Sequence, residues 1–437
     1  MESERLSPAI GLLEAISPDP DRPDNEILTY PSLAQAIENK QPIEEVLVRT
    51  YYAAEDDSAL QRAAAQRLAE YELIETAAAL QNAQTYEHQR DLSRQFTTAS
   101  VDLFGSPDRT TAAFLLEQLM TELCVLQTNY DVDADLLDYL LQTYDEILRH
   151  SNVPHEYRVA FDEEQAGQAA TALGAFLWQR YPYSLSVFDG NPSELIDAAG
   201  IVERFELALE QLQTHRDESW KQWRVLVTDD SCLSVNPISK HLIVGSHRAS
   251  VSLGELRGLF GHEVLVHALR AGNGSHLSHE FERGLPGYID AEEGFACFVE
   301  HALSGVVPQK MYDRYLDIAL ALGTIDGHAH SRQELFRLVH ARTVIRAQAA
   351  RKVESASTIR HESWTHVNRI FRGTLGNDIV GVFTKDIAYY HGYQKMTAFI
   401  IDELANGTQP EELWSLLTLG KFDPTNLLHM LELARNS

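Results

Sequence analysis

A short run of residues in the second half of the chain has the composition of a metal-binding helix. Residues 258–270 read Gly-Leu-Phe-Gly-His-Glu-Val-Leu-Val-His-Ala-Leu-Arg, so that His262 and His267 enclose Glu263. In the familiar version of this pattern the histidines are four residues apart and reach one metal ion from one helix face. Here they are five apart, which on a regular helix separates them by roughly 140°. A π-helical turn would realign them, so the spacing predicts either a π-bulge or no shared metal.

A second acidic stretch downstream can supply a third ligand. Asp290-Ala291-Glu292-Glu293-Gly294 opens a predicted helix that continues through Glu300 and His301. Two histidines and one carboxylate that leave a fourth position open are the ligands of a catalytic zinc ion. The two stretches therefore predict a hydrolytic zinc site whose third ligand is a glutamate of this second helix.

Together the two stretches resemble the zinc metallopeptidase family known for its Q-E-G-L-A motif, the microtubule-associated tyrosine carboxypeptidase-like family. That family pairs H-E-x-x-x-H with a downstream E-G-L-A. In this chain Glu293 precedes Gly294, Glu292 replaces the usual Gln, and Phe295 replaces Leu. Other short motifs of the family are matched in the same order between about residues 100 and 400: Leu103-Phe-Gly-Ser-Pro107, Asn273-Gly274, Arg369-Ile-Phe-Arg372-Gly373 and Phe383-Thr-Lys385-Asp386-Ile-Ala-Tyr389.

The resemblance implies an α+β fold with a zincin-like (gluzincin-type) catalytic domain and Zn²⁺ as its cofactor. It implies that His262, His267 and Glu293 bind the metal. In such a site the metal lowers the pKa of a water molecule, and Glu263 takes up the proton as general base. The expected activity is that of a carboxypeptidase, which removes a C-terminal residue from a peptide or protein.

A carboxypeptidase also has to neutralise the terminal carboxylate of its substrate and stabilise an oxyanion. The cations of the two distal motifs, Lys385, Arg372 and Arg369, are the predicted carboxylate-binding residues. Tyr389 is the preferred oxyanion donor, and its neighbours Tyr390 and Tyr393 are rivals. For each of these side chains, an internal ion pair or a packed ring is an equal alternative. An edge strand, with 241–245 as the first choice, is expected to align the peptide by main-chain pairing.

Several roles stay open at this stage. Glu292 either accepts a hydrogen bond from a ligand histidine or is a first-turn helix carboxylate. Arg270 forms an ion pair or faces the substrate. Histidines in polar stretches, among them His328, His330 and His366, are expected to be solvated rather than to form a second metal site. An aminopeptidase, an endopeptidase and a non-catalytic protein that retains zinc are the alternative functions; the intact Glu263 argues against the last.

The elements that must position these residues divide the chain near residue 150. Residues 1–150 are predicted to form an acidic helical region, with a Pro/Asp-rich connector over 17–32 and a helix that starts at Ser106-Pro107. Residues 151–437 are predicted to form the catalytic domain, in which short strands precede helices that resume near Ser252. The expected strands are Tyr157–Phe161, Trp223–Thr228 and His241–Gly245.

Charge and composition exclude several classes of partner. The net charge of the chain is −28, and residues 1–220 carry 40 of the 64 acidic and 14 of the 36 basic residues, a balance of −26. Such a field repels phosphate backbones and anionic lipid, so neither nucleic acid nor a membrane is expected as a partner. No apolar run reaches membrane-spanning length, and the first residues are polar, which is not typical of a secretory signal. Three scattered cysteines favour a cytoplasmic location. The oligomeric state cannot be inferred.

Overall fold

The computed structural model describes residues 59–151, 161–215, 218–229, 232–237, 239–351, 355–374 and 381–436. These residues are mostly helical and contain two small sheets, as expected of an α+β chain. They form two compact units, each assembled from two separate stretches of the chain. Unit 1 comprises the described residues of Met1–Arg158 and Lys310–Ile387, and unit 2 those of Val159–Gln309 and Ala388–Ser437. Residues 310–387 thus group with the N-terminal helices, whereas the division at residue 150 groups them with the histidine helix.

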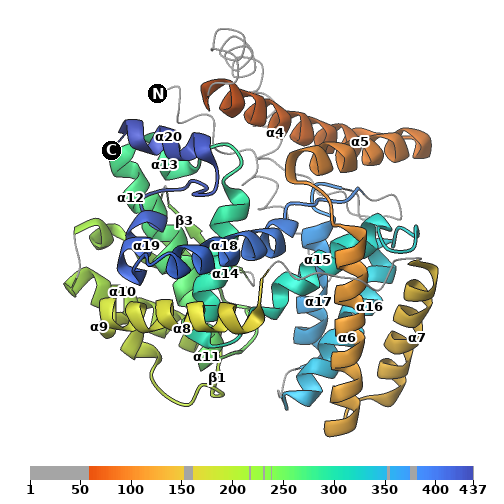
Figure 1. The fold of residues 1–437 in the computed structure, drawn as a ribbon. Helices are drawn as coiled ribbons and strands as arrows, with labels where there is room; N and C mark the ends of the chain where they lie inside the picture. Colours follow the sequence, from red (N-terminus) through yellow and green to blue (C-terminus); the bar gives the residue numbers. More distant parts are fainter. Residues whose placement is uncertain are drawn as a thin grey trace. The chain divides into compact units, whose positions relative to one another are not determined.

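Unit 1 is helical, and segments distant in sequence lie side by side in it. Figure 1 shows α6 and α7 next to α16 and α17. Phe383, from the second stretch, packs on Phe96 and Leu73 of the first stretch in one hydrophobic cluster. The helices are α4 (Ala59–Asn82), α5 (Tyr86–Phe104), α6 (Arg109–Asn129), α7 (Ala134–Ser151), α15 (Gln309–Leu322), α16 (Arg332–Ala349) and α17 (Ala356–Ile370).

The start of α6 corrects one local prediction. The N-cap is Asp108, whose Oδ1 accepts a hydrogen bond from the backbone N–H of Thr111 at 2.8 Å. The expected cap, Ser106, lies two residues too early. Aspartate caps a helix at least as well as serine does, so the Ser-Pro-Asp sequence offers two valid starts that local rules cannot rank.

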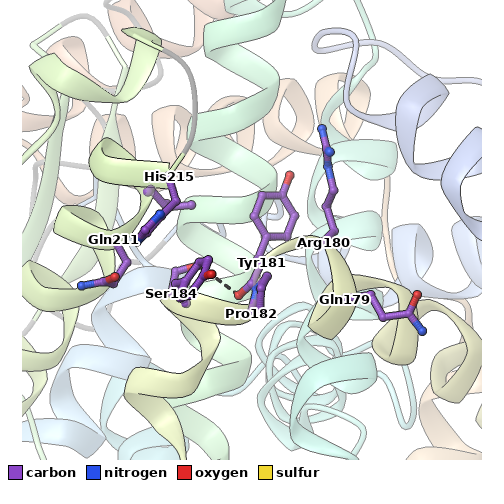
Figure 2. Close-up of a pocket in the computed structure, with 9 residues that line it drawn as sticks. Gln179, Arg180, Tyr181, Pro182, Ser184, Gln211 and His215 are labelled. Carbon is purple, nitrogen blue, oxygen red and sulfur yellow. Dashed lines mark hydrogen bonds between the residues drawn. The ribbon is translucent and has the colours of Figure 1, made fainter.

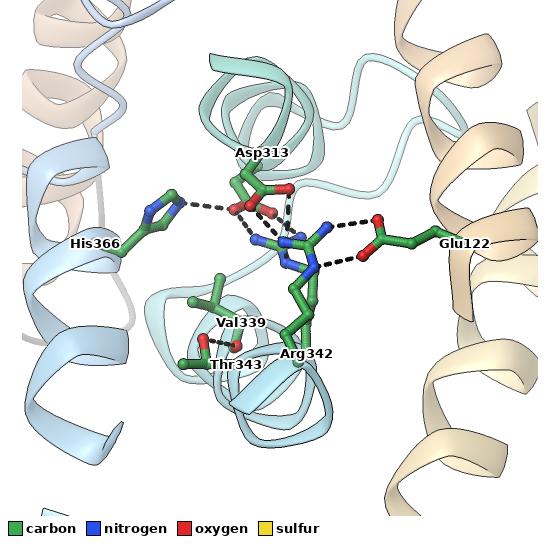
Figure 3. Close-up of polar contacts among 8 residues, drawn as sticks. Glu122, Asp313, Val339, Arg342, Thr343 and His366 are labelled. Carbon is green, nitrogen blue, oxygen red and sulfur yellow. Dashed lines mark hydrogen bonds and ion pairs between the residues drawn. The ribbon is translucent and has the colours of Figure 1, made fainter. Parts of the chain in front are cut away.

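A buried ionic network joins α6, α15, α16 and α17 in unit 1 (Figure 3). Arg342 binds both carboxylate oxygens of Asp317, at 3.1 and 2.5 Å, and His366 Nε2 lies 2.7 Å from Asp317. Arg346 binds Glu122 and Asp313 with its three nitrogens. Because Asp317 is fully buried, the Arg342 guanidinium and the contact with His366 supply the compensation that a buried carboxylate needs. His366, expected to be solvated, is therefore part of the interior network.

Unit 2 holds the histidine helix and the last helices of the chain. Its longer helices are α8 (Glu163–Arg180), α10 (Ala198–His215), α11 (Leu253–Phe260), α12 (Leu269–Leu277), α14 (Ile289–Ser304), α18 (Ile387–Ala405), α19 (Pro410–Leu417) and α20 (Leu427–Asn436). Its shorter helical segments are α9 (Pro182–Leu185), η2 (Ser186–Phe188), η3 (Glu218–Gln222), η4 (Gly261–Ala268) and α13 (His279–Arg283). As predicted, helices resume at Ser252, which forms a capping box with Glu255.

The sheets of unit 2 are small and lie beside this helix series. β1 (Leu195–Ile196) pairs antiparallel with β5 (Val251–Ser252). The other sheet has the order β2-β4-β3, with β2 (Arg224–Thr228) parallel and β3 (Leu233–Asn236) antiparallel to β4 (His241–Gly245). The strands expected near 223–228 and 241–245 are confirmed. The prediction that 241–245 is an edge strand is wrong, because β4 is central and buries Leu242 and Val244 completely.

The edge beside the histidine helix is instead β3, which contacts η4. The connector expected over 17–32 and the strand expected over 157–161, save Phe161 itself, lie outside the described residues. Within the described part of the chain, no helix combines the length and apolar character needed to span a bilayer.

Candidate functional site

The two histidines lie on a π-helical segment, as their spacing predicts. α11, η4 and α12 form one continuous helix in which Gly261–Ala268 has π geometry. The i→i+5 hydrogen bonds of a π-helix bring residues five apart onto one face. The imidazole rings of His262 and His267 are consequently neighbours, with their centroids 4.9 Å apart. The π geometry compensates for the extra residue between them and so brings the two rings together.

Glu293 of α14 lies between the two rings. Its Oε2 is 3.7 Å from His262 Nε2 and 3.6 Å from His267 Nε2. This oxygen is buried and has no hydrogen-bond partner, although buried acceptors are usually satisfied. Two imidazole nitrogens therefore converge on a carboxylate oxygen that lacks a protein donor.

This donor set fits a metal ion. The three ligand atoms lie within 4.8 Å of one another, and this is the one group of three or more such side chains among the described residues. Tetrahedral zinc with bonds of about 2.0–2.1 Å separates its ligand atoms by roughly 3.3 Å, a few tenths less than the distances here. Two imidazoles and one carboxylate leave a fourth position for water or substrate.

Each histidine is held from behind by a second carboxylate of α14. His267 Nδ1 donates to Glu292 Oε1 at 2.8 Å, and His262 Nδ1 donates to Glu300 Oε2 at 3.1 Å, in the tautomers that leave both Nε2 atoms facing Glu293. Of the two roles considered for Glu292, this contact favours the hydrogen bond to a predicted ligand histidine. The role of Glu300 is not among the sequence predictions. Its spacing of seven from Glu293 places both on one face of α14, which is the signal that could have revealed it.

The charges of this cluster shift the pKa values of its members. Burial alone would lower the pKa of His267, but Glu293 and Glu292 outweigh it and raise that pKa to about 9. Burial would also lower the pKa of His262, but hydrogen bonds with Cys297, Glu293 and Glu300 outweigh it and raise that pKa. The pKa of Glu293 is held well below its usual range by the two histidines, against the effect of burial. A bound metal ion requires both Nε2 atoms to be deprotonated.

Glu263 follows His262 in η4 and is largely buried, with 8% of its surface exposed. Its carboxylate is close enough to His262 for its charge to raise the pKa of that imidazole. The predicted general base thus lies next to the predicted ligands, in the same helical turn.

Tyr389 is the tyrosine of its group that lies beside the histidines. Its ring is nearly parallel to that of His262, with 6.3 Å between centroids, and it is half-buried. The rival Tyr393 instead shares a hydrogen bond of 2.9 Å with His301, and Tyr390 is buried. The ring contact with His262 therefore favours Tyr389 as the oxyanion donor of this group.

Two glycines set the position of Tyr389. Gly294, directly after Glu293, packs against Gly392 of α18, so that a Cβ on Gly294 would lie 2.0 Å from the Gly392 carbonyl carbon. A Cβ on Gly392 would lie 1.9 Å from the Asp290 carbonyl oxygen. The backbones of α14 and α18 touch here, and this contact places the first turn of α18 near the histidines.

The predicted carboxylate-binding cations belong to unit 1, separate from the unit that holds the histidines. Arg369 donates to both oxygens of Asp386, at 2.8 and 3.2 Å, and the pKa of Asp386 is lowered by Arg369, Arg314 and Arg372 against the effect of burial. The two distal motifs thus bind each other through Asp386. Lys385 is half-buried beside it. Arg270, the other ambiguous cation, is 1% exposed and pairs with Glu292 at 2.6 Å, which settles it as an internal ion pair.

Size alone does not identify this site. A hollow of about 320 Å³ lies between the ends of α8 and α10, lined by Tyr181, Tyr183 and His215 among others (Figure 2). A second hollow, of about 530 Å³, lies between α7 and α16 in unit 1 and includes His330, which is buried rather than solvated. Neither is lined by His262, His267 or Glu293. Chemistry rather than volume therefore selects the histidine–glutamate cluster.

Comparison with known proteins bears on the same region. A family model described as microtubule-associated tyrosine carboxypeptidase matches residues 168–437, which include the π-helix, α14 and both distal motifs. No match was found among curated proteins or among solved structures. Since the family model covers more than half of the sequence, the chain belongs to the microtubule-associated tyrosine carboxypeptidase family.

Proposed function

We propose that this protein is a zinc-dependent carboxypeptidase with a zincin-like catalytic domain, acting on the C-terminus of a peptide or protein. The observation that carries the proposal is the convergence of two histidine Nε2 atoms on Glu293 Oε2, a buried oxygen without a hydrogen-bond donor. Family membership supports the peptidase class. A cytoplasmic location is part of the same proposal and rests on the scarce cysteines.

In this mechanism His262, His267 and Glu293 would hold Zn²⁺, which supplies a Lewis acid that lowers the pKa of water at the open position. Glu263 accepts the proton of the attacking water on its carboxylate and delivers it to the leaving amine. Tyr389 donates a hydrogen bond from its hydroxyl group to the oxyanion of the tetrahedral centre. Glu292 and Glu300 keep the imidazoles in the tautomers that present Nε2 to the metal.

Recognition of the terminal carboxylate remains assigned to Lys385, Arg372 and Arg369. The bidentate pair with Asp386 competes for Arg369, and Arg372 is buried and close enough to Asp386 to lower its pKa. A tyrosine or another aromatic residue at the substrate terminus is the preference that the family description suggests.

An endopeptidase is the second function that an observation favours. β3 is an edge strand in contact with η4, and an extended peptide can pair with such an edge on both sides of a scissile bond. An aminopeptidase would need carboxylates that bind a substrate amine, and no contact of the described residues supports such a role.

The test compares wild type with Glu263→Gln on tyrosine-ending peptides that have free or amidated C-termini. Glu263→Gln is expected to keep the metal and the fold but to lose on the order of 10²–10⁴ in turnover. Full activity of this variant would exclude Glu263 as the base. The matched variant His267→Ala is expected to lose zinc, as measured by metal analysis. Equal cleavage of amidated peptides would replace the carboxypeptidase by the endopeptidase.

A further inference from the structure

A buried carboxylate behind the histidine cluster collects cations from two distant parts of unit 2. Glu292 is 3% exposed, and both of its oxygens are engaged. Oε1 accepts from His267 Nδ1 and lies 3.5 Å from Lys421 Nζ. Oε2 accepts from Arg270 Nη1 at 2.6 Å. Glu292 is thus the link between a predicted metal ligand and two cations, the buried Arg270 and the 11% exposed Lys421.

Those cations are fixed by a C-terminal segment, residues 418–423, here named the C-terminal strap. Arg270 donates from Nε to the Gly420 carbonyl at 2.8 Å and from Nη2 to the Phe422 carbonyl at 2.6 Å. The backbone of Lys421 exchanges hydrogen bonds with Phe281 and Leu285, at 2.8 and 3.0 Å. The strap is therefore held on both sides of Lys421, and this fixes where its ammonium group can lie.

Electrostatics explains why such an arrangement is needed. Glu292 is buried and the adjacent Glu293 is 15% exposed, and together with Glu263 and Glu300 they surround two histidines. Like charges at this distance repel strongly in a poorly hydrated site. Cations paired with Glu292 offset its charge next to Glu293 and keep Glu292 aimed at His267 Nδ1.

We infer that Lys421 and Arg270 are positioning residues for His267, which act through Glu292, so that the C-terminal strap completes the metal centre. This inference rests on the proposed function, in that it takes His267 to be a metal ligand. The competing interpretation is that the strap only closes the fold. The two interpretations differ for a protein in which Glu292 has already lost its charge. If Lys421 acts through Glu292, removal of the Lys421 charge then has no further effect on metal affinity; if the strap only closes the fold, its effect is unchanged.

The experiment is a double-mutant cycle on the full chain, with Zn²⁺ affinity measured by competition with a chromogenic chelator. Lys421→Met is expected to weaken zinc binding by about 3–10-fold and Glu292→Gln by about 10-fold, the low end for partners of ligand histidines. In the Glu292→Gln background, Lys421→Met should cause no further loss. Lys395→Met is the matched control, because it removes another lysine–carboxylate pair of the strap, with Asp423, that does not touch Glu292.

The visible spectrum of the Co²⁺-substituted protein gives a second readout. It should change in Lys421→Met and stay unchanged in Lys395→Met. If Lys421→Met lowers the unfolding temperature of the metal-free protein, Lys421→Gln and Lys421→Arg take its place. Zinc affinity must then follow charge, so that Arg retains it and Gln loses it.

The possible failures are distinguishable. If wild type binds no zinc at a 1:1 ratio, the proposed function fails and the inference with it. If wild type binds zinc but Lys421→Met and Lys395→Met weaken it equally, or if Lys421→Met has its full effect in the Glu292→Gln background, the inference is overturned. The proposed function would stand in that case.

Discussion

The contact between Gly294 and Gly392 makes a quantitative prediction about the site. Gly294→Ala adds one methyl group at the point where α14 and α18 touch. That methyl would lie 2.0 Å from the Gly392 carbonyl carbon, whereas ordinary contacts begin at 3.4 Å. The two helices must therefore part by about 1.4 Å, because the obstacle is backbone and cannot rotate away.

Two opposing effects decide the sign of the stability change. Alanine favours the helix over glycine by about 1 kcal/mol. Overpacking against a rigid neighbour costs about 3 kcal/mol, so the net loss is about 2 kcal/mol, or a decrease in unfolding temperature of roughly 4–8 °C. Because Glu293 adjoins the mutated residue and Tyr389 lies on the displaced helix, turnover should fall by about 10²-fold.

The assay combines calorimetry, zinc titration and peptidase kinetics. Gly272→Ala, on α12, is the matched control, since no atom lies within 4 Å of its added Cβ. It should keep wild-type activity and gain up to about 1 kcal/mol. If Gly294→Ala kept the unfolding temperature, zinc affinity and turnover of the wild type, the argument that this glycine pair positions Tyr389 would be refuted.

Three further predictions concern charge and metal. Burial would raise the pKa of Asp317, but Arg342 and His366 hold it at about 2, below the ordinary 3.8. The ionised carboxylate therefore stabilises the fold by about 2 kcal/mol above about pH 4, and this stabilisation is lost as pH falls towards 2. Asp317→Asn should flatten this part of the acid unfolding curve measured by circular dichroism. A chelator should abolish activity and lower the unfolding temperature, and added Zn²⁺ should restore both; activity that persists without metal would exclude the zinc mechanism. Arg369→Gln should destabilise the protein by about 1–3 kcal/mol, because buried Asp386 loses its bidentate partner, without a change in zinc affinity; a loss of zinc in titration would contradict the assignment of Arg369 to a separate unit.

The π-helix could be predicted from the sequence because geometry leaves one way for these two histidines to share a metal ion. Two histidines five residues apart cannot share an ion on a regular helix, so the motif demands an irregular turn at His262–His267. Glu293 followed from its motif. The second carboxylate on each histidine was harder to predict, since Glu292 has two plausible local roles and Glu300 lies outside the motif that identifies Glu293.

Long-range pairing accounts for most of what the sequence did not reveal. Alternating β-branched residues indicate that 224–228 and 241–245 are strands, but strand order depends on contacts across the sheet, and β4 proved to be central. No sequence rule predicts which charges on separate helices or loops pair with each other, as Arg369 does with Asp386 and Arg270 with Glu292. The division into two units also depends on long-range contacts, because each unit combines an earlier and a later stretch of the chain.

Because unit 1 is built from two separate stretches of the chain, the protein cannot be cut between them without dividing that unit. A fragment cut to the family match, residues 168–437, would retain α16 but lose α6 and α7, against which α16 packs. Arg346 would lose Glu122, and Phe383 would lose the aromatic partners Phe96 and Phe104. Such a fragment would expose apolar surface and unpaired cations, and we expect it to aggregate. The N-terminal helices thus serve as an internal folding partner for a segment that follows them by about two hundred residues, although they lie outside the family match.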